Sequence, residues 1–526
     1  MKGFLRKLFS PTTFIVIILL IELALIGLGW FLLEIVLEDI LPDGSIWTSI
    51  IYLGVRFLIW LIEVLVFFRI INKYENPEYK VTWLAFMAIL PITTVIMYLL
   101  FGHPSLRRKD RKIIEPTNKI QEELFAINKE EIDDFRNNVP LEYRGVYKYL
   151  RKATRLSTST NNKTTYYKNG EQFFPDFIKC LKEAKEFIFM EFFIIGEGKE
   201  WNQIDAVLKE KAKEGVEVRL IYDDIGSFGL LPSNYPKQLK KYGIKCYKFN
   251  KFKPLLSGVY NNRTHRKIAV VDHKYGFTGG MNLADEYAND IVRFGYWKDT
   301  MVKVEGRAIA NLIATFLQNF DLCTHVVSDY KKYIEYDYEK HEGGGYLFAF
   351  GDGPGSFDGN EAIGEQNYLN LINIAKRTIW ISTPYLIPTY RLTEALKNAA
   401  KRGVEVNLFV PGIPDKKPVY WMAKCDFRML VEAGINIYIY TPGFNHEKEC
   451  LVDDIIAFVG TINFDFRSLT HHFECGIDIY NDPCLKDIKE DFLEMQTESK
   501  KVEKTYKVNP FQRFIVSIFK LFRTLL

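Results

Sequence analysis

Long apolar runs lie near the N-terminus of the chain, and an amphipathic pattern closes it. Three of these runs are as long as membrane-spanning helices, at about residues 14–36, 46–71 and 81–101. Residues 509–526 place Phe and Ile side chains on one helical face and basic side chains opposite, as is typical of a helix in a membrane interface. Packing of this helix on another part of the protein is the alternative. We therefore expect transmembrane helices within residues 1–112 and an interfacial helix at the C-terminus.

Between these ends, helical and strand-like spacing alternate. The pattern predicts helices and strands in the order helix, strand, helix, strand, at 174–185, 187–195, 204–213 and 216–222. The same order returns in the second half of the chain, where Ala375-Lys376 matches Ala184-Lys185 at a shift of 191 residues. Such a fixed shift indicates an internal duplication.

The duplication predicts an α/β fold with two βαβ sandwich domains related by a pseudo-two-fold axis. We place these domains at residues 143–340 and 361–503. Residues 113–142 are polar with a helical pattern, and we expect them to link the membrane segments to the first domain. Residues 341–360 are rich in Gly, Asp and Pro, and we expect them to link the two domains.

One motif occurs once in each half. Both copies read His-x-Lys-x-x-x-x-Asp, and their defining residues are His265, Lys267 and Asp272, then His446, Lys448 and Asp453. Each copy is followed by a Gly and an Asn at matching offsets, because Asn282 and Asn463 both lie 17 residues after their His. A single match would be a weak signal, but two copies with the same downstream spacing are not.

The residue types in the motif suit phosphate chemistry. On a strand, residues i and i+2 point to one face, so each His lies beside its Lys. An imidazole can attack phosphorus or carry a proton near neutral pH, and an ammonium binds phosphate oxygens. If the two copies pack together, two His flank one phosphate and two Lys neutralise its charge. The pattern therefore predicts phosphodiester exchange through a phosphohistidine, with no metal or other cofactor.

Other polar residues are expected to support this chemistry. Asn282 and Asn463 should hold the phosphate oxygens, and Asp272 and Asp453 more plausibly tie down local structure than react. A nucleophilic imidazole needs a partner on its second nitrogen. Glu474 begins the strand after the second motif and can lie beside the motif strand, and Asp299 holds the corresponding place in the first half. An ordinary acid at a strand edge is the alternative for both.

Cysteine and histidine usage argues against a metal centre. The 7 Cys are scattered and form no CxxC, which indicates reduced thiols and a globular part that faces the cytoplasm. His471 and His472 lack acidic or Cys neighbours at ligand spacing, so we expect them to bind no metal.

The duplicated motif, followed by Gly-Gly or Gly-Thr and Asn, resembles the phospholipase D superfamily and, more narrowly, the bacterial cardiolipin synthases. The likeness extends from about Asn76 to the C-terminus. Further segments that carry it are Gly279-Gly280-Met281-Asn282, Trp297-Lys298-Asp299-Thr300, Thr383-Pro384-Tyr385 and Gly460-Thr461-Ile462-Asn463. One departure is His472, which stands where the subgroup usually has Asn.

The resemblance implies roles for the motif residues. One His is the nucleophile, and the other acts first as general acid and then as general base. We assign His265 to the first role and His446 to the second, although the symmetry of the motif leaves the reverse order open. In the superfamily, a Glu at the position of Glu474 orients a catalytic imidazole, and we expect Asp299 to be its equivalent.

The resemblance implies a membrane-bound phosphatidyltransferase that makes cardiolipin and glycerol from two phosphatidylglycerol molecules. Its partners would be phosphatidylglycerol and anionic membrane lipids, which the basic cluster at residues 107–112 would attract. The expected location is the cell membrane, with several spans and with the catalytic domains inside.

Three alternatives remain at this point. Water or another alcohol could be the acceptor, as in a phospholipase D-type hydrolase or a related transferase. A nuclease is disfavoured because the chain has hydrophobic segments and no basic stripe interleaved with aromatic residues, so we expect no nucleic-acid partner. A lipid-binding scaffold without turnover is disfavoured because both copies of the motif keep His and Lys.

Overall fold

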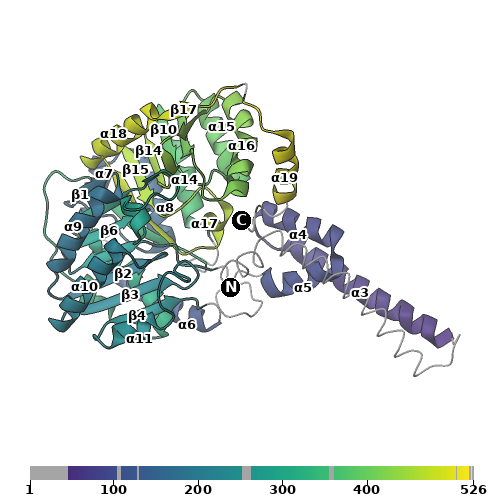
Figure 1. The fold of residues 1–526 in the computed structure, drawn as a ribbon, viewed down its shortest axis with the longest axis horizontal. Coiled ribbons are helices and arrows are strands. Elements are labelled where there is room, and N and C mark those ends of the chain that lie inside the picture. The colour runs from purple at the N-terminus through teal and green to yellow at the C-terminus, as the bar shows by residue number, and fades with distance from the viewer. Residues whose placement is uncertain are drawn as a thin grey trace. The chain divides into compact units, whose positions relative to one another are not determined.

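The structure is a computed structural model that describes residues 46–102, 108–126, 129–251, 262–354, 361–504, 506–520 and 523. The chain forms two compact units. The first unit is Met1–His103 with two short later segments, and the second contains almost all of the remaining chain. In the described residues the first unit is helical and the second holds the sheets (Figure 1).

The described helices of the first unit are α3 (Ile46–Asn72), α4 (Pro77–Ile89) and α5 (Pro91–Phe101). Helix α3 confirms the helical prediction for residues 46–71. The apolar run at 81–101 is divided between α4 and α5, because Pro91 has no N–H to continue α4 and instead starts α5. The run at 14–36 lies outside the described residues. Among the helices described, none is both long enough and apolar enough to cross a membrane.

The second unit contains two large mixed sheets. The first has seven strands in the order β1 (Lys163–Tyr167), β8 (Met301–Glu305), β6 (Tyr275–Gly279), β5 (Ile268–Val271), β2 (Phe187–Phe192), β3 (Glu217–Asp223) and β4 (Lys245–Phe249). The second has eight, in the order β9 (Tyr346–Asp352), β16 (Glu474–Tyr480), β15 (Ile456–Gly460), β14 (Glu449–Val452), β10 (Thr378–Ser382), β11 (Glu405–Pro411), β12 (Asn436–Tyr440) and β17 (Ser499–Lys501).

The two sheets match strand for strand, with β17 added at one edge of the second. In each sheet the three strands joined by helical crossovers are parallel, as β2, β3 and β4 are, and the motif strand joins them antiparallel. This topology confirms the duplicated α/β fold. It corrects the simple βαβ picture, because β5 and β14 belong to antiparallel hairpins with β6 and β15.

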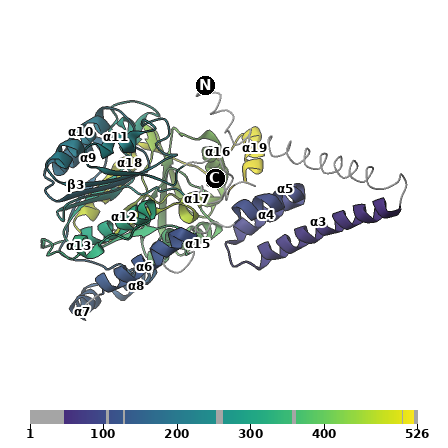
Figure 2. The same cartoon turned by 90° about the horizontal axis from the view of Figure 1, so that it is seen from below.

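Helices cover the sheets on both faces. In the first half α9 (Gly170–Lys182), α10 (Lys199–Lys213) and α11 (Tyr235–Lys240) lie on one face, and α12 (Ile309–Thr324) and α13 (Tyr330–Ile334) lie on the other (Figure 2). The helices of the second half are α14 (Ile363–Ile374), α15 (Tyr390–Lys401), α16 (Lys417–Glu432), α17 (Phe466–Thr470) and α18 (Cys484–Thr497). Because both faces are covered, β5 and β14 are buried at every position and read as continuous apolar runs rather than alternating ones.

The two halves are packed as one body. Helix α12 of the first half contacts β9 of the second sheet, and α18 of the second half contacts β1 of the first sheet. A short parallel pair, β7 (Tyr296–Lys298) with β13 (Gly443–Asn445), joins the halves directly. A single hydrophobic cluster includes residues of both sheets, for example Val270 and Leu451.

Both stretches that we expected to be linkers contribute to the folded body. Residues 113–142 are helical as expected, in α6 (Arg108–Leu124), α7 (Lys129–Asn138) and the start of α8 (Leu141–Thr154), and Ile114 and Phe125 are buried in the core. Within residues 341–360, the segment Tyr346–Asp352 is the edge strand β9. Glycines on both sides of this strand made the stretch read as a loop.

Helix α19 (Pro510–Lys520) packs on α16. Val516 is buried against Met422 and Ile387, and Lys520 Nζ lies 3.0 Å from Asp426 Oδ1. Part of the predicted apolar face remains exposed, including Phe511, Phe514 and Ile518. The packing alternative therefore holds for one side of the helix, while the other side keeps an exposed apolar surface.

Candidate active site

The two motifs meet at the boundary between the halves, each held by the other half. His265 N–H donates to Phe473 O at 2.7 Å, and His446 N–H donates to Lys298 O at 2.7 Å. Phe473 and Lys298 are the residues just before Glu474 and Asp299. The two contacts are equivalent, which supports a pseudo-two-fold relation at the site.

Each motif imidazole is oriented by an acid of the opposite half. His265 Nδ1 lies 2.9 Å from Glu474 Oε2, and His446 Nδ1 lies 2.6 Å from Asp299 Oδ2. We expected each acid beside the motif strand of its own half. That placement is wrong because β15 separates β14 from β16, whose first residue is Glu474. With Nδ1 held by a carboxylate, Nε2 is the ring nitrogen left to react.

The two lysines lie buried beside the histidines. Lys267 Nζ donates to His265 O at 2.7 Å, and Lys448 Nζ lies 2.8 Å from His446 Nδ1. Burial lowers the pKa of Lys267 to about 7, with Lys448 adding to the shift, and burial lowers the pKa of Lys448 to about 8. The site therefore holds closely spaced positive charge away from water, an environment that favours an anionic ligand.

Burial also sets the protonation of the other titrating groups. It lowers the pKa of His265 and His446 well below the usual range, and the two lysines shift both in the same direction. Burial raises the pKa of Asp299 to about 6, against the opposing effect of Lys448. Near neutral pH the imidazoles are thus neutral and Asp299 is mostly ionised. A neutral imidazole is the form that can act as a nucleophile.

The two Asn residues of the motifs differ in their contacts. Asn282 Nδ2 donates to Tyr287 OH at 2.6 Å, and its Oδ1 accepts from Ile194 N–H at 2.9 Å. Its side chain therefore helps to fix local structure, and the phosphate contact that we expected stays a prediction. Asn463 Oδ1 is buried and has no hydrogen-bond partner within the described part of the chain, so this residue keeps polar capacity for a ligand.

The motif aspartates secure the opposite ends of the motif strands. Asp272 accepts from the backbone N–H groups of Lys185, Glu186 and Phe187, at 2.8 to 2.9 Å. Asp453 does the same at the start of β10, for the residues Lys376, Arg377 and Thr378. Both aspartates thus tie down local structure, as we expected, and neither takes part in the His–acid pairs.

Sequence reasoning missed the hydroxyl groups that hold Glu474. Ser468 Oγ donates to Glu474 Oε1 at 2.5 Å, and Thr461 Oγ1 donates to Oε2. Thr461 belongs to the Gly-Thr segment that follows the second motif, and Ser468 lies five residues after Asn463, so the family-like segment was a signal for the first of them.

His472 has an acidic neighbour after all, because its Nδ1 lies 3.4 Å from Glu474 Oε1. The possible ligand atoms of His265, His472 and Glu474 lie within 4.8 Å of one another. Both Glu474 oxygens already accept hydrogen bonds, from His265, Ser468 and Thr461, so a bound ion would have to displace them. The arrangement therefore serves first to hold the carboxylate.

Aromatic rings surround both imidazoles. The ring centroid of Phe193 lies 5.1 Å from that of His265, and Trp297 and Phe444 lie 5.5 and 5.4 Å from His446. These apolar neighbours exclude water from the histidines and contribute to the burial that lowers their pKa values.

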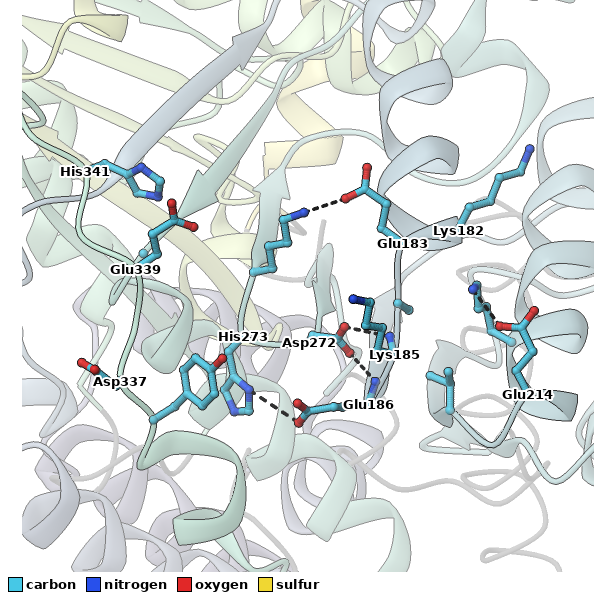
Figure 3. Close-up of a pocket in the computed structure, with 16 residues that line it drawn as sticks. Lys182, Glu183, Lys185, Glu186, Glu214, Asp272, His273, Asp337, Glu339 and His341 are labelled. Carbon is cyan, nitrogen blue, oxygen red and sulfur yellow. Dashed lines mark hydrogen bonds and ion pairs between the residues drawn. The ribbon is translucent and has the colours of Figure 1, made fainter.

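A separate cavity of about 930 Å³ lies around Asp272 and His273, at the other end of β5 from His265 (Figure 3). Some of its charged groups are paired, for example Lys274 with Glu183 at 2.7 Å and Lys211 with Glu214 at 2.8 Å. Neither His265 nor His446 lines it. This cavity is therefore distinct from the two-His site.

The duplicated fold and the crossed His–acid pairs define a class of phospholipase D-like phosphoryl-transfer proteins. A family profile described as "Cardiolipin synthase, PLD-like domain" matches residues 177–320 and 368–496. A second, described as "Phospholipase_D-nuclease N-terminal", matches residues 61–103. The chain belongs to the cardiolipin synthase family of the phospholipase D superfamily, which confirms the resemblance seen in the motifs.

Individual relatives agree with this assignment. A protein of Streptococcus mutans serotype c described as "Uncharacterized protein" is 39% identical over 83% of this chain and 94% of its own length. A cardiolipin synthase of Alkalihalophilus pseudofirmus is 33% identical over 88% of this chain and 92% of its own. The crystal structure of a phosphatidylserine synthase from Haemophilus influenzae Rd KW20 matches with a TM-score of 0.56 and 14% identity, over 73% of this chain and 99% of that one, which shows the shared fold.

Proposed function

We propose that this protein is a membrane-bound phosphatidyltransferase that makes cardiolipin and glycerol from two phosphatidylglycerol molecules. The observation that carries the proposal is the pair of buried imidazoles, each with Nδ1 on a carboxylate of the opposite half and each beside a buried lysine. Cardiolipin synthases among the relatives support this substrate.

In the first step, His265 Nε2 attacks the phosphorus of phosphatidylglycerol. A P–N bond forms as the P–O bond to glycerol breaks, and His446 donates a proton to the leaving oxygen. Lys267 and Lys448 neutralise the negative charge on the phosphoryl oxygens. His446 is neutral in the empty site, so it takes up a proton from solvent when the substrate binds, because the negative charge of the phosphodiester raises the imidazole pKa and Asp299 stabilises the imidazolium.

In the second step, a hydroxyl of another phosphatidylglycerol replaces glycerol. Neutral His446 accepts the hydroxyl proton, the oxygen attacks phosphorus, and the P–N bond to His265 breaks. The products are cardiolipin and a free His265. The same site would give phosphatidic acid if water took the place of the hydroxyl, so its apolar surroundings are needed to exclude water.

The membrane location is part of the proposal. Along α3, many large apolar side chains are exposed, among them Leu53, Phe57 and Leu65. Soluble monomers rarely expose so much contiguous apolar surface, so a bilayer is the environment that suits this helix. We propose an anchored enzyme with its α/β unit in the cytoplasm, where the seven free thiols would stay reduced.

The proposal is tested by incubating the purified full chain with phosphatidylglycerol alone, in detergent with a chelator. Cardiolipin and glycerol should appear in equal amounts, and both should be lost in His265→Ala and His446→Ala variants. Mass spectrometry of acid-quenched wild type should find the phosphatidyl group on His265. Phosphatidic acid as the main product would assign water as acceptor, and no turnover would refute the proposed reaction.

A further inference from the structure

Three loops of the α/β unit expose large apolar side chains. The first follows β3 and carries Ile225, Phe228 and Leu230, with Phe228 76% exposed. The second precedes β7 and carries Ile291 and Val292, with Val292 83% exposed. The third follows β11 and carries Ile413, 42% exposed. Single exposed apolar residues are common, but these come from both halves of the chain, and each loop is attached to the surroundings of one of the two motif histidines.

The first loop is attached to the surroundings of His265. Ser227 Oγ donates to Phe193 O at 3.3 Å and accepts from Ile195 N–H at 3.0 Å. The Phe193 ring lies against His265. At the end of β3, Asp223 Oδ1 also binds Arg263 Nη2 at 2.7 Å, two residues before the catalytic histidine. Phe228 therefore projects from a loop that is anchored on both sides to the His265 half-site.

The second and third loops are attached to the surroundings of His446. The Phe294 ring lies 6.0 Å from that of Phe444, which itself packs on His446. Ile413 N–H donates to Gly443 O at 3.1 Å. The two loops touch each other, because a Cβ at Gly295 would lie 3.0 Å from Ile413 Cδ1.

Exposed positive charge stands beside the third loop. Lys416 and Lys417 lie three and four residues after Ile413, and both are exposed at the start of α16. Lys416 Nζ lies 4.7 Å from the ring centroid of Tyr385. Burial and the two motif lysines are the larger causes that lower the pKa of His265 and His446, and the charge of Lys416 lowers both pKa values further. The charge of Lys416 is therefore felt at the site. Apolar side chains beside lysines are the combination that binds an anionic bilayer surface.

We propose that these residues form an entrance rim, made of Ile225, Phe228, Leu230, Ile291, Val292, Ile413, Lys416 and Lys417, that docks on an anionic bilayer around the opening of the active site. The apolar side chains enter the interfacial layer, and the lysines contact lipid phosphates. A lipid headgroup then reaches the histidines while its acyl chains stay in the membrane. This inference rests on the proposed lipid substrate.

The rim is tested by comparing two substrates with the full chain. One is phosphatidylglycerol with six-carbon chains as dissolved monomers, and the other is long-chain phosphatidylglycerol in vesicles that contain the enzyme. For Phe228→Ser/Val292→Ser, the ratio of vesicle rate to monomer rate should fall about tenfold or more, since apolar burial at the interface is lost. Phe228→Leu/Val292→Leu, which stays apolar, should keep the wild-type ratio.

Val326→Ser is the matched control. Val326 is 66% exposed and lies near the start of β3, where Arg219 Nη1 donates to Ser328 Oγ at 3.1 Å, away from the opening. This variant should keep the wild-type ratio. An unchanged ratio in the Ser double variant, or an equal fall in Val326→Ser, would overturn the rim.

A second measurement does not depend on turnover. Cys323 and Cys425, which are half-buried, are replaced by Ser, and an environment-sensitive fluorophore is attached to Phe228→Cys or Val326→Cys in the His446→Ala background. Brominated lipids in vesicles containing phosphatidylglycerol should quench the probe at position 228 and not at 326. If the probe at position 228 is not quenched, the entrance rim is wrong, whichever lipid the enzyme uses. If the wild type makes no cardiolipin but the probe is still quenched, only the proposed reaction is rejected.

Discussion

His446 Nδ1 lies 2.6 Å from Asp299 Oδ2, although the two residues are 147 positions apart and belong to different halves of the chain. His265 and Glu474, 209 positions apart, form the matching pair in the opposite direction. Neither half therefore contains a complete His–acid pair. The site exists only when both halves are folded and packed together, so the duplication is a condition for the chemistry.

Removing one of these acids should leave its imidazole without the carboxylate that orients the ring. In Asp299→Asn, the neutral amide no longer provides a negative charge that stabilises the His446 imidazolium. Its N–H group can also donate to Nδ1, which stabilises the wrong tautomer of His446. We expect the rate of cardiolipin formation to fall by about 10² to 10⁴, with folding preserved because the side chains have the same shape. Steady-state rates on phosphatidylglycerol, beside circular dichroism spectra, measure this.

Asp478→Asn is a control for the loss of a buried carboxyl. Asp478 Oδ1 accepts from Asn367 Nδ2 at 2.9 Å, and burial raises the pKa of Asp478 to about 8, so it is largely neutral near pH 7. This variant should keep full activity at that pH. If Asp299→Asn were as active as Asp478→Asn, the orienting role of Asp299 would be wrong.

The sequence predicted the parts of the fold that depend on local pattern. Strand β2 begins at Phe187 as expected, and α10 ends at Lys213 as expected. The repeated motif also identified the two histidines and the two lysines, and the strand positions after the motifs pointed to Asp299 and Glu474. These features are readable because apolar periodicity and a duplicated motif are properties of the chain itself.

Features that depend on packing between the halves could not be predicted. The exchange of Asp299 and Glu474 between the halves follows from how the two sheets meet, and no local spacing encodes it. The motif also gave no sign that Asn282 binds Tyr287 and the backbone of Ile194. The role of Arg266 was also hidden, since its guanidinium lies in the core and binds Glu474 O at 3.0 Å.

Substrate binding should weaken as pH rises through the pKa values of the site lysines. Below about pH 7 both Lys267 and Lys448 are protonated and attract the phosphodiester. As the pH rises, Lys267 loses its charge near its pKa of about 7 and Lys448 near its pKa of about 8. We expect KM for phosphatidylglycerol to rise above about pH 7, by up to about tenfold per pH unit. Measurement of KM in detergent between about pH 6 and pH 9 tests this.

Lys267→Arg separates the charge of this residue from its size. Arg stays protonated throughout this range, so the KM profile should flatten even though the larger side chain lowers the absolute rate. Lys303→Arg is the control, because Lys303 pairs with Asp176 at 2.6 Å outside the site. Parallel KM profiles for wild type and Lys267→Arg would show that Lys267 does not titrate there.

Lys298 should be important for stability as well as for the site. Its Nζ lies 2.8 Å from Glu447 and 2.6 Å from Asp491, and all three residues are buried. Lys298→Met leaves two buried carboxylates without a cation, so we expect it to lower the unfolding free energy by about 3–5 kcal/mol. Glu447→Gln should cost less, because Lys298 keeps Asp491.

A double-mutant cycle measures the coupling between Lys298 and Glu447. Chemical unfolding in detergent should show that Lys298→Met/Glu447→Gln is less destabilised than the sum of the single variants. The measurement is made at about pH 8, because burial raises the pKa of Glu447 to about 7 and the carboxylate must be ionised. Simple additivity would mean that the ion pair contributes nothing to stability.

The motif aspartates should matter for folding rather than for chemistry. Asp453→Ala leaves three backbone N–H groups without their acceptor, which should lower the unfolding free energy by about 1–3 kcal/mol. Asp454→Ala controls for backbone strain, since both residues have positive φ, 54° and 61°, and Asp454 binds Lys489 rather than the β10 backbone. Activity per folded molecule should match wild type in both variants. A loss of kcat in Asp453→Ala with unchanged stability would instead make this aspartate part of the reaction.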